Sequence, residues 1–236
     1  FDCRINSAAY AKEAACVLAA CGIRVYLFDE LRPTPELSFA IRELGATSGI
    51  NITASHNPKE YNGYKVYWSD GAQLPPEHAA QVAAAMEAID PLSNIPSLDY
   101  NEAVSKGLIE LIGSKIDEKF LENVMAQSVR PGAAAKADIK IVYTPFNGAG
   151  AKLVPEALKR LGVKRLYCVE EQMLPDGSFP TAKNPNPEFP EGFEYALRLA
   201  EKKDADIIIG SDPDSDRIGV LAKEKTGGYR LLSGNQ

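Results

Sequence analysis

The stretch from Ile207 to Ala222 reads Ile-Ile-Ile-Gly-Ser-Asp-Pro-Asp-Ser-Asp-Arg-Ile-Gly-Val-Leu-Ala, two short apolar runs separated by a loop with three aspartates. Short apolar runs bounded by Gly, Pro and Asp are typical of buried strands. We therefore predict strands at residues 205–209 and 218–222, joined by a loop at residues 210–217. In an open α/β sheet, ligands bind beyond the carboxyl ends of the strands, so this loop is predicted to lie at a binding site.

Short strands alternate with longer helices along the rest of the chain, a pattern that is typical of an α/β layer fold. We interpret it as two consecutive doubly wound domains with mixed or parallel sheets and right-handed crossovers. The small, unpatterned stretch at 130–136 contains Pro-Gly and predicts a linker, so the domains are expected at residues 1–129 and 130–236. The expected helices are 7–21 (with Ser7 as N-cap), 35–44, 75–89, 114–127, 150–161 and 191–202; the other expected strands are 23–28, 48–53, 64–68, 139–143 and 165–169, and a Pro- and Ser-rich loop is expected at 90–98.

Size and composition indicate an ordinary globular protein. The chain has 236 residues, of which 45% are hydrophobic and 25% charged, enough for one large or two small domains with cores. A formal charge of −6 and a pI near 5.1 argue against a nucleic-acid partner, which needs basic clustering. No apolar run is long enough for a membrane span. The four cysteines have no metal-site spacing, so we expect reduced thiols and a cytoplasmic location.

The aspartate loop predicts a magnesium site. Asp212, Asp214 and Asp216 alternate along an extended loop, so their carboxylates can converge on one hard cation that prefers oxygen ligands. A calcium-binding EF-hand is excluded, because positions 6 and 12 of that loop require Gly and Glu and are Arg217 and Lys223 here. A solvated acidic turn is the structural alternative. An aspartyl-phosphate phosphatase, in which a strand-end Asp-x-Asp supplies the nucleophile, also remains open.

A second loop, Thr53-Ala-Ser-His-Asn-Pro58, follows the predicted strand at 48–53. Ser55 could accept or carry a phosphoryl group, and His56 and Lys65 nearby could offset its charge. The alternative is a polar turn in which His56 only makes loop hydrogen bonds. A Ser-His-Asp hydrolase is disfavoured, because there is no Gly-x-Ser-x-Gly elbow and adjacent Ser and His are not expected to form the required hydrogen bond.

Together the two loops resemble the α-D-phosphohexomutase family, which includes phosphoglucomutases and phosphomannomutases. The serine loop is similar to the phosphoserine signature of that family, and the stretch Gly-Ser-Asp-Pro-Asp-Ser-Asp-Arg at 210–217 is similar to its metal loop. The longer match through Tyr-Asn-Gly-Tyr-Lys-Val-Tyr-Trp at 61–68 resembles the phosphoglucomutase/phosphopentomutase branch. The resemblance extends over essentially the whole chain.

The resemblance implies a role for each site residue. Ser55 would be phosphorylated and pass its phosphoryl group to the sugar, and the three aspartates would hold magnesium with the Ser55 phosphate as a further ligand. Lys65 and Arg217 would stabilise charge on the transferring group, and His56 would help to position the serine. The implied activity interconverts hexose 1- and 6-phosphates, with glucose favoured, through a sugar bisphosphate.

The resemblance also implies that the chain is part of a longer enzyme. Family members have four domains, and the chain matches only the later part of the first and most of the second. It begins without Met, and the sugar-specificity loop of the third domain and the phosphate-binding loop of the fourth are absent. We therefore expect domains III and IV as missing partners and negligible mutase activity from this piece. A non-catalytic phosphosugar- or metal-binding module is a third interpretation, although retention of Ser55 and all three aspartates argues against it.

Overall fold

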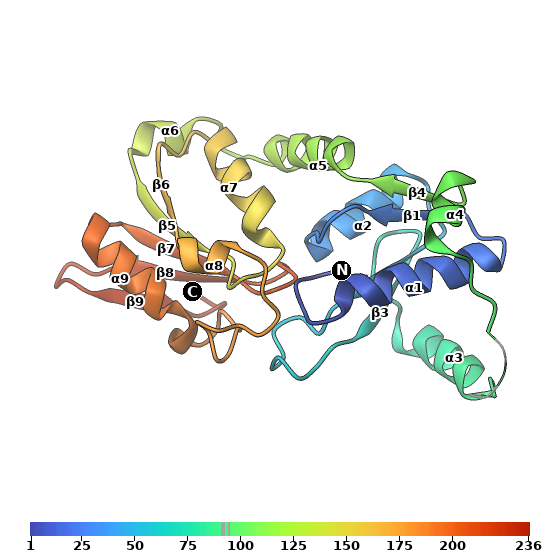
Figure 1. The fold of residues 1–236 in the computed structure, drawn as a ribbon. Helices are drawn as coiled ribbons and strands as arrows, with labels where there is room; N and C mark the ends of the chain where they lie inside the picture. The colour runs from blue at the N-terminus through green and yellow to red at the C-terminus, as the bar shows by residue number, and fades with distance from the viewer. Residues whose placement is uncertain (91–92, 94) are drawn as a thin grey trace.

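The computed structural model describes residues 1–90, 93 and 95–236, whose strands form one five-stranded sheet and two smaller sheets. The five-stranded sheet has the order β6-β5-β7-β8-β9, with β5, β6 and β7 parallel and β8 and β9 antiparallel. Figure 1 shows this sheet beside the N-terminal part of the chain, with α5 running between them. Its strands are β5 (Lys140–Thr144), β6 (Arg165–Cys168), β7 (Ile207–Ser211), β8 (Ile218–Lys223) and β9 (Tyr229–Leu232).

The faces of the five-stranded sheet are covered by α9 and α7. Val142 and Ile208 pack against Ala196 and Ala200, whose small side chains let α9 approach the strands closely. On the other face, Gly150 begins α7 at a position where a Cβ would lie 2.4 Å from the Tyr143 hydroxyl, so only glycine fits there. The helical elements of residues 130–236 are α6 (Ala133–Ala137), α7 (Gly150–Arg160), α8 (Glu170–Met173), the 3-10 helix η1 (Pro190–Phe193) and α9 (Glu194–Lys203).

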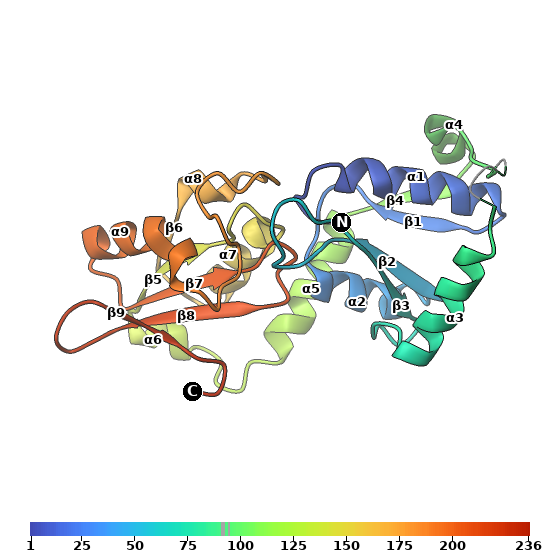
Figure 2. The same ribbon diagram turned by 90° about the horizontal axis from the view of Figure 1, so that it is seen from below.

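The N-terminal part contains two pairs of strands. β1 (Val25–Phe28) is parallel to β4 (Ile109–Ile112), and β2 (Ser48–Ile52) is antiparallel to β3 (Tyr64–Trp68), the pair seen edge to edge in Figure 2. An apolar cavity of about 610 Å³ lies between β1 and β2 and is lined by both strands, α1 and α2, away from the aspartate loop. The helices are α1 (Ser7–Ala20), α2 (Thr34–Glu43), α3 (Pro76–Glu87), α4 (Tyr100–Ser105) and α5 (Ser114–Ala126).

A buried ionic cluster joins α2, α5 and α7. Arg32 is 2% exposed and donates to both oxygens of Asp117 on α5, at 2.7 and 3.1 Å. Lys152 of α7 lies 3.1 Å from the same carboxylate. Burial opposes ionisation of Asp117, but the hydrogen bonds from Arg32 and other partners lower its pKa. The cluster therefore fixes the start of α2 next to the five-stranded sheet, where the aspartate loop lies.

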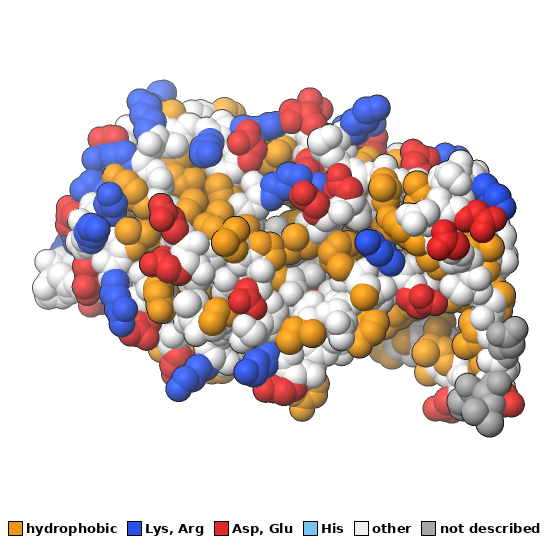
Figure 3. All heavy atoms as spheres, in the orientation of Figure 1, with side chains coloured by type: hydrophobic (Ala, Val, Ile, Leu, Met, Phe, Trp, Pro, Cys, Tyr) orange, Lys and Arg blue, Asp and Glu red, His pale blue; other side chains and the backbone are white. Residues whose placement is uncertain are grey.

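The surface carries charges of both signs. Figure 3 shows Lys and Arg side chains interspersed with Asp and Glu over the face in view. Within the described ranges, no helix combines the length and apolar character needed to cross a lipid bilayer.

The α/β class predicted from sequence is confirmed, and the predicted helices and strands match observed elements to within a few residues. Three details differ. Asn6, in the left-handed conformation, occupies the N-cap of α1, and Ser7 is instead the first helical residue, with its hydroxyl bonded to Asp2. The stretch at 130–136 is partly helical, since α6 begins at Ala133. The helix expected at 191–202 begins as the 3-10 turn η1.

Among the described residues, five short elements were not predicted: α4, β4, α6, α8 and β9. The loop expected at 90–98 falls partly on residues 91, 92 and 94, which lie outside the described residues. The division into domains at residue 130 stays a prediction; within the described part of the chain, no strand pairs across it.

Candidate functional site

The serine loop and the aspartate loop meet at a hydrogen bond. The serine loop follows β2 and the aspartate loop follows β7. The Ser55 hydroxyl donates to Asp212 Oδ2 at 3.0 Å, across 157 positions of sequence. Both residues are buried, Asp212 completely and Ser55 to 8% exposure. The fold therefore brings together two loops that the sequence could only assign to separate parts of the chain.

The aspartate loop is a tight turn built around Asp212. Its Oδ1 accepts the backbone N–H groups of Asp216 and Arg217 at 3.1 and 2.9 Å, and its carbonyl accepts the N–H of Ser215. Ser215 adopts the left-handed conformation, with φ of 57°, which turns the chain back on itself. As a result, one oxygen from each of Asp212, Asp214 and Asp216 lies within 4.8 Å of the others.

The electrostatics of this cluster favour a bound cation. Burial together with the charge of Asp214 raises the pKa of both Asp212 and Asp216. Burial also opposes ionisation of Asp214, but the Lys65 ammonium and several hydrogen bonds lower its pKa. Asp214 Oδ1 is buried and has no hydrogen-bond partner among the described residues. A divalent cation would bind that oxygen and offset the repulsion between the three carboxylates. A set of ligands made up of oxygens alone fits Mg²⁺.

Lys65 and His56, two further residues singled out from sequence, lie at the same place. Lys65 Nζ is 3.1 Å from Asp214 Oδ2. His56 Nδ1 is 3.2 Å from the Ser55 hydroxyl, but that hydroxyl donates its proton to Asp212, so this contact is not the hydrogen bond from Ser to His that a hydrolase requires. The contact is available because Ser55 is left-handed, with φ of 54°, which turns its hydroxyl toward the neighbouring ring. Burial, followed by the charge of Arg217, lowers the pKa of His56.

The Arg217 guanidinium pairs with a carboxylate outside the cluster, Glu188, at 3.2 Å, and the side chain is 39% exposed. It lies close enough for its charge to act on His56, while its backbone N–H donates to Asp212. The structure thus gathers Ser55, His56, Lys65 and the three aspartates, and leaves the Arg217 guanidinium on a neighbouring carboxylate. Its role in charge stabilisation stays a prediction.

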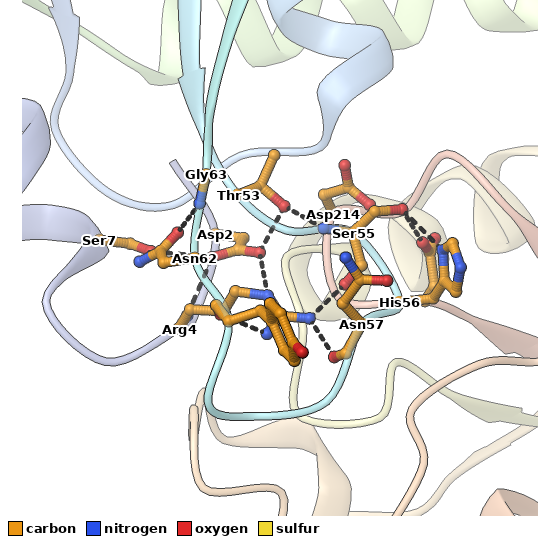
Figure 4. A network of polar contacts seen from close by, with 12 residues as sticks. Asp2, Arg4, Ser7, Thr53, Ser55, His56, Asn57, Asn62, Gly63 and Asp214 are labelled. Atoms are coloured by element: carbon orange, nitrogen blue, oxygen red, sulfur yellow. Dashed lines mark hydrogen bonds and ion pairs between the residues drawn. The ribbon is translucent and has the colours of Figure 1, made fainter.

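A buried arginine that sequence reasoning missed holds the serine loop. Figure 4 shows the Arg4 side chain enclosed by the curve of the loop, with Asp2 beside it. Arg4 is 3% exposed. Its two terminal nitrogens donate, at 2.5–2.9 Å, to the backbone carbonyls of Ser55, Asn57, Pro58 and Tyr61. No local sequence pattern links residue 4 to a loop about fifty positions later, so only the folded chain exposes this role.

Asp2 supports the same loop through a hydroxyl. Thr53 Oγ1 donates to Asp2 Oδ2 at 2.6 Å and accepts the backbone N–H of Ser55 at 2.8 Å. The backbone at Ser55 is therefore held from its N–H side by Thr53 and from its carbonyl side by Arg4. Thr34, which contacts the aspartate loop, and Asn51, which contacts Thr34, were also missed.

Fold and site together define an α/β protein in which a buried serine hydroxyl faces a three-carboxylate cation site at the ends of two strands. A family model described as phosphoglucomutase/phosphomannomutase, alpha/beta/alpha domain I, matches residues 1–93. The model for domain II of the same family matches residues 118–227. The chain belongs to the α-D-phosphohexomutase family, as its two loops led us to expect.

Individual relatives agree with this assignment. Phosphoglucomutases of Staphylococcus epidermidis and Staphylococcus aureus (strain MRSA252) are 39% and 40% identical over the whole chain. The chain spans 42% of the length of these curated relatives. Among solved structures, a candidate phosphomannomutase of Thermus thermophilus is 26% identical with a TM-score of 0.79, over 94% of this chain and 47% of that one. A Paramecium phosphoglucomutase, parafusin, shares the fold at 19% identity and a TM-score of 0.71, over 94% and 44% of the two chains.

Proposed function

We propose that this chain is the phosphoryl-carrying half of a phosphosugar mutase that interconverts hexose 1- and 6-phosphates, with glucose phosphate as the favoured substrate. The observation that carries the proposal is the hydrogen bond from the Ser55 hydroxyl to Asp212, which belongs to a cluster of three carboxylates that could hold a metal ion. The relatives named phosphoglucomutase support the choice of glucose phosphate. The domain division at residues 1–129 and 130–236 is part of the proposal.

The reaction proposed is a pair of phosphoryl transfers. In the first, the bond between phosphorus and Ser55 Oγ breaks as a sugar hydroxyl oxygen bonds to phosphorus, and the proton of that hydroxyl is transferred to Ser55 Oγ. The product is a sugar bisphosphate and a free serine. After the bisphosphate has reoriented, the bond between its other phosphorus and the sugar oxygen breaks as Ser55 Oγ bonds to that phosphorus, the Ser55 proton passes to the sugar oxygen, and the isomeric monophosphate leaves. The sum is an isomerisation with a regenerated phosphoserine.

The residues of the site suit this chemistry because phosphoryl transfer depends mainly on positioning and on stabilisation of charge. Arg4 and Thr53 hold Ser55, and Lys65 supplies a cation beside Asp214. His56 helps to position the serine: because the Ser55 proton is donated to Asp212, a His56 ring that carries its proton on Nδ1 donates to Ser55 Oγ.

The ligands proposed to hold Mg²⁺ are the phosphate on Ser55 and the carboxylates of Asp212, Asp214 and Asp216. When bound, the ion would neutralise negative charge on the transferring phosphoryl group. Arg217 is proposed as a further charge stabiliser, which requires its guanidinium to leave Glu188. We propose that domains III and IV of the same enzyme bind the phosphosugar. We also propose a cytoplasmic location. The free thiols of all four cysteines support this proposal.

The test is phosphorylation of the chain itself. Incubation with glucose 1,6-bisphosphate and Mg²⁺ should add one phosphoryl group, and peptide mapping should place an acid-stable phosphate on Ser55. Ser55→Ala should remain unlabelled, whereas Ser233→Ala, in an exposed terminal turn, should label like the parent. Phosphate on Asp212 that hydroxylamine removes would support the aspartyl-phosphate phosphatase instead. A full-length enzyme that carries both loops and has no mutase activity would support the non-catalytic module.

A further inference from the structure

Thr34 reaches the aspartate loop from the other part of the chain. It is the first residue of α2, and its backbone N–H donates to the Asp214 carbonyl at 2.8 Å. Its side-chain hydroxyl donates to Asp214 Oδ2 at 2.9 Å. The two residues are 180 positions apart, and Thr34 is 7% exposed. Thr34 therefore donates hydrogen bonds to both the backbone carbonyl and the carboxylate of Asp214.

Asn51 fixes the direction of the Thr34 hydroxyl. The side-chain amide of Asn51, on β2, donates to Thr34 Oγ1 at 2.7 Å, and Asn51 is 1% exposed. A threonine hydroxyl has one proton and two lone pairs. Because one lone pair receives the amide proton, the hydroxyl proton is free to point at Asp214. Asn51, Thr34 and Asp214 thus form a chain of hydrogen bonds in which each residue donates to the next and which ends on Asp214 Oδ2.

This chain of hydrogen bonds makes the two oxygens of Asp214 different. Oδ2 accepts from the Thr34 hydroxyl and from Lys65 Nζ, at 2.9 and 3.1 Å. Oδ1 is buried and receives no hydrogen bond from the described residues. Two donors on one oxygen restrain the rotation of the carboxylate, which leaves Oδ1 as the oxygen of Asp214 that is free to bind a cation together with Asp212 and Asp216.

We propose that Thr34 is a positioning residue for the cation site: with Asn51 behind it, Thr34 turns Asp214 so that Oδ1 is the ligand oxygen. The inference rests on the proposed function only in requiring that the three aspartates bind a divalent cation. Groups that orient metal ligands from behind are a general part of metal sites, and their loss costs about 10–100-fold in affinity.

The proposal also explains why the start of α2 is anchored so firmly. Arg32, two residues before Thr34, is held by Asp117 through two hydrogen bonds. Because Thr34 belongs to the part of the chain that carries the serine loop, the cation site is complete only when that part is docked on the aspartate loop. Cation binding and docking are therefore coupled: whatever loosens α2 should weaken the cation, and the cation should strengthen the docking.

The experiment measures Mn²⁺ binding to the 236-residue chain by electron paramagnetic resonance, with Mg²⁺ as competitor. Thr34→Val keeps the side-chain shape and removes the hydroxyl, and should weaken Mn²⁺ binding about 10–100-fold. Thr34→Ser restores the hydroxyl and should bind within about threefold of the parent chain. Asn51→Leu leaves the Thr34 hydroxyl able to donate but no longer oriented. The Mn²⁺ affinity of this variant should lie between those of Thr34→Val and Thr34→Ser. Thr226→Val, in the exposed turn before β9, is the matched control and should bind as the parent does.

Thermal unfolding separates positioning from general stability. With EDTA, each variant gives its own melting temperature, and the rise on adding saturating Mn²⁺ reports the binding energy alone. Thr34→Val should show a smaller rise than the parent and Thr34→Ser a nearly full one; if Thr34→Val does not fold, the comparison of Asn51→Leu with the parent decides. Equal Mn²⁺ affinity and an equal rise in the Thr34 and Asn51 variants and the parent would overturn the role of Thr34 while leaving the cation site intact. No Mn²⁺ binding by the parent chain would overturn the proposed cation site, and this inference with it.

Discussion

Replacing Arg4 with lysine should loosen the serine loop more than a retained charge would suggest. The two terminal nitrogens of Arg4 donate to four carbonyls of one loop, a pattern that matches the planar fork of a guanidinium. A lysine ammonium is a single point with three donors, so at least one of the four hydrogen bonds must be lost. A hydrogen bond to a charged group contributes about 1.5–3 kcal/mol. We therefore expect Arg4→Lys to lower the free energy of unfolding by about 2–5 kcal/mol, for one or two lost bonds.

The measurements are urea unfolding and hydrogen–deuterium exchange of the peptide that covers residues 54–63. Exchange in this peptide should accelerate in Arg4→Lys more than exchange in β5 or β7, because the lost bonds all belong to the loop. Arg24→Lys is the matched control, since Arg24 is exposed and makes one surface ion pair with Glu110, worth at most about 1 kcal/mol.

The consequence for Ser55 is equally specific. Arg4 holds the Ser55 carbonyl, so its loss should release the left-handed backbone that turns the Ser55 hydroxyl toward Asp212. Labelling of Ser55 by glucose 1,6-bisphosphate should then fall in Arg4→Lys, even at temperatures where the variant is fully folded. An Arg4→Lys chain with unchanged unfolding energy and unchanged exchange at residues 54–63 would refute the reasoning.

Three further outcomes are expected. Asp117→Asn should destabilise the chain in urea by about 1.5–3 kcal/mol, because the buried Arg32 would lose its hydrogen bonds to a charged partner but keep its ion pair with Asp29; a loss below about 1 kcal/mol would contradict a buried ion pair. Glu36 is fully buried, and burial, followed by its hydrogen bond with Asp117 and the charge of that residue, raises its pKa to about 8, so the folded chain retains a proton that the unfolded chain releases. Stability should therefore fall as the pH rises between the ordinary carboxyl pKa and about 8. Glu36→Gln should make that slope shallower without abolishing it, because the pKa of Asp212 is raised as well, and paired urea titrations across this range would detect the difference. Gly148→Ala would place a Cβ 2.5 Å from Pro213 in the aspartate loop, and calorimetry should find weaker Mg²⁺ binding; unchanged affinity would mean that the loop can shift without losing its ligands.

Local sequence predicted most of the elements, and the reason is physical. The long helices and the apolar strands carry a periodicity that is complete within each segment, as at β3, where the predicted and observed ends coincide. β4 has no such pattern: it is four residues long, and it is a strand because Ile109 and its neighbours pair with β1, more than eighty positions earlier. The N-cap of α1 was misassigned because Ser7 bonds to Asp2 rather than to its own helix.

For the site, the sequence by itself determined the chemistry of the two loops: a serine able to carry a phosphoryl group, and three carboxylates spaced to share a cation. Those properties belong to side chains close together in the chain. Only the tertiary structure decided that Ser55 meets Asp212, that Arg4 shapes the serine loop, and that Thr34 selects an oxygen of Asp214. Each of these contacts joins residues between about fifty and 180 positions apart, and such contacts depend on how strands and helices pack, which no local pattern encodes.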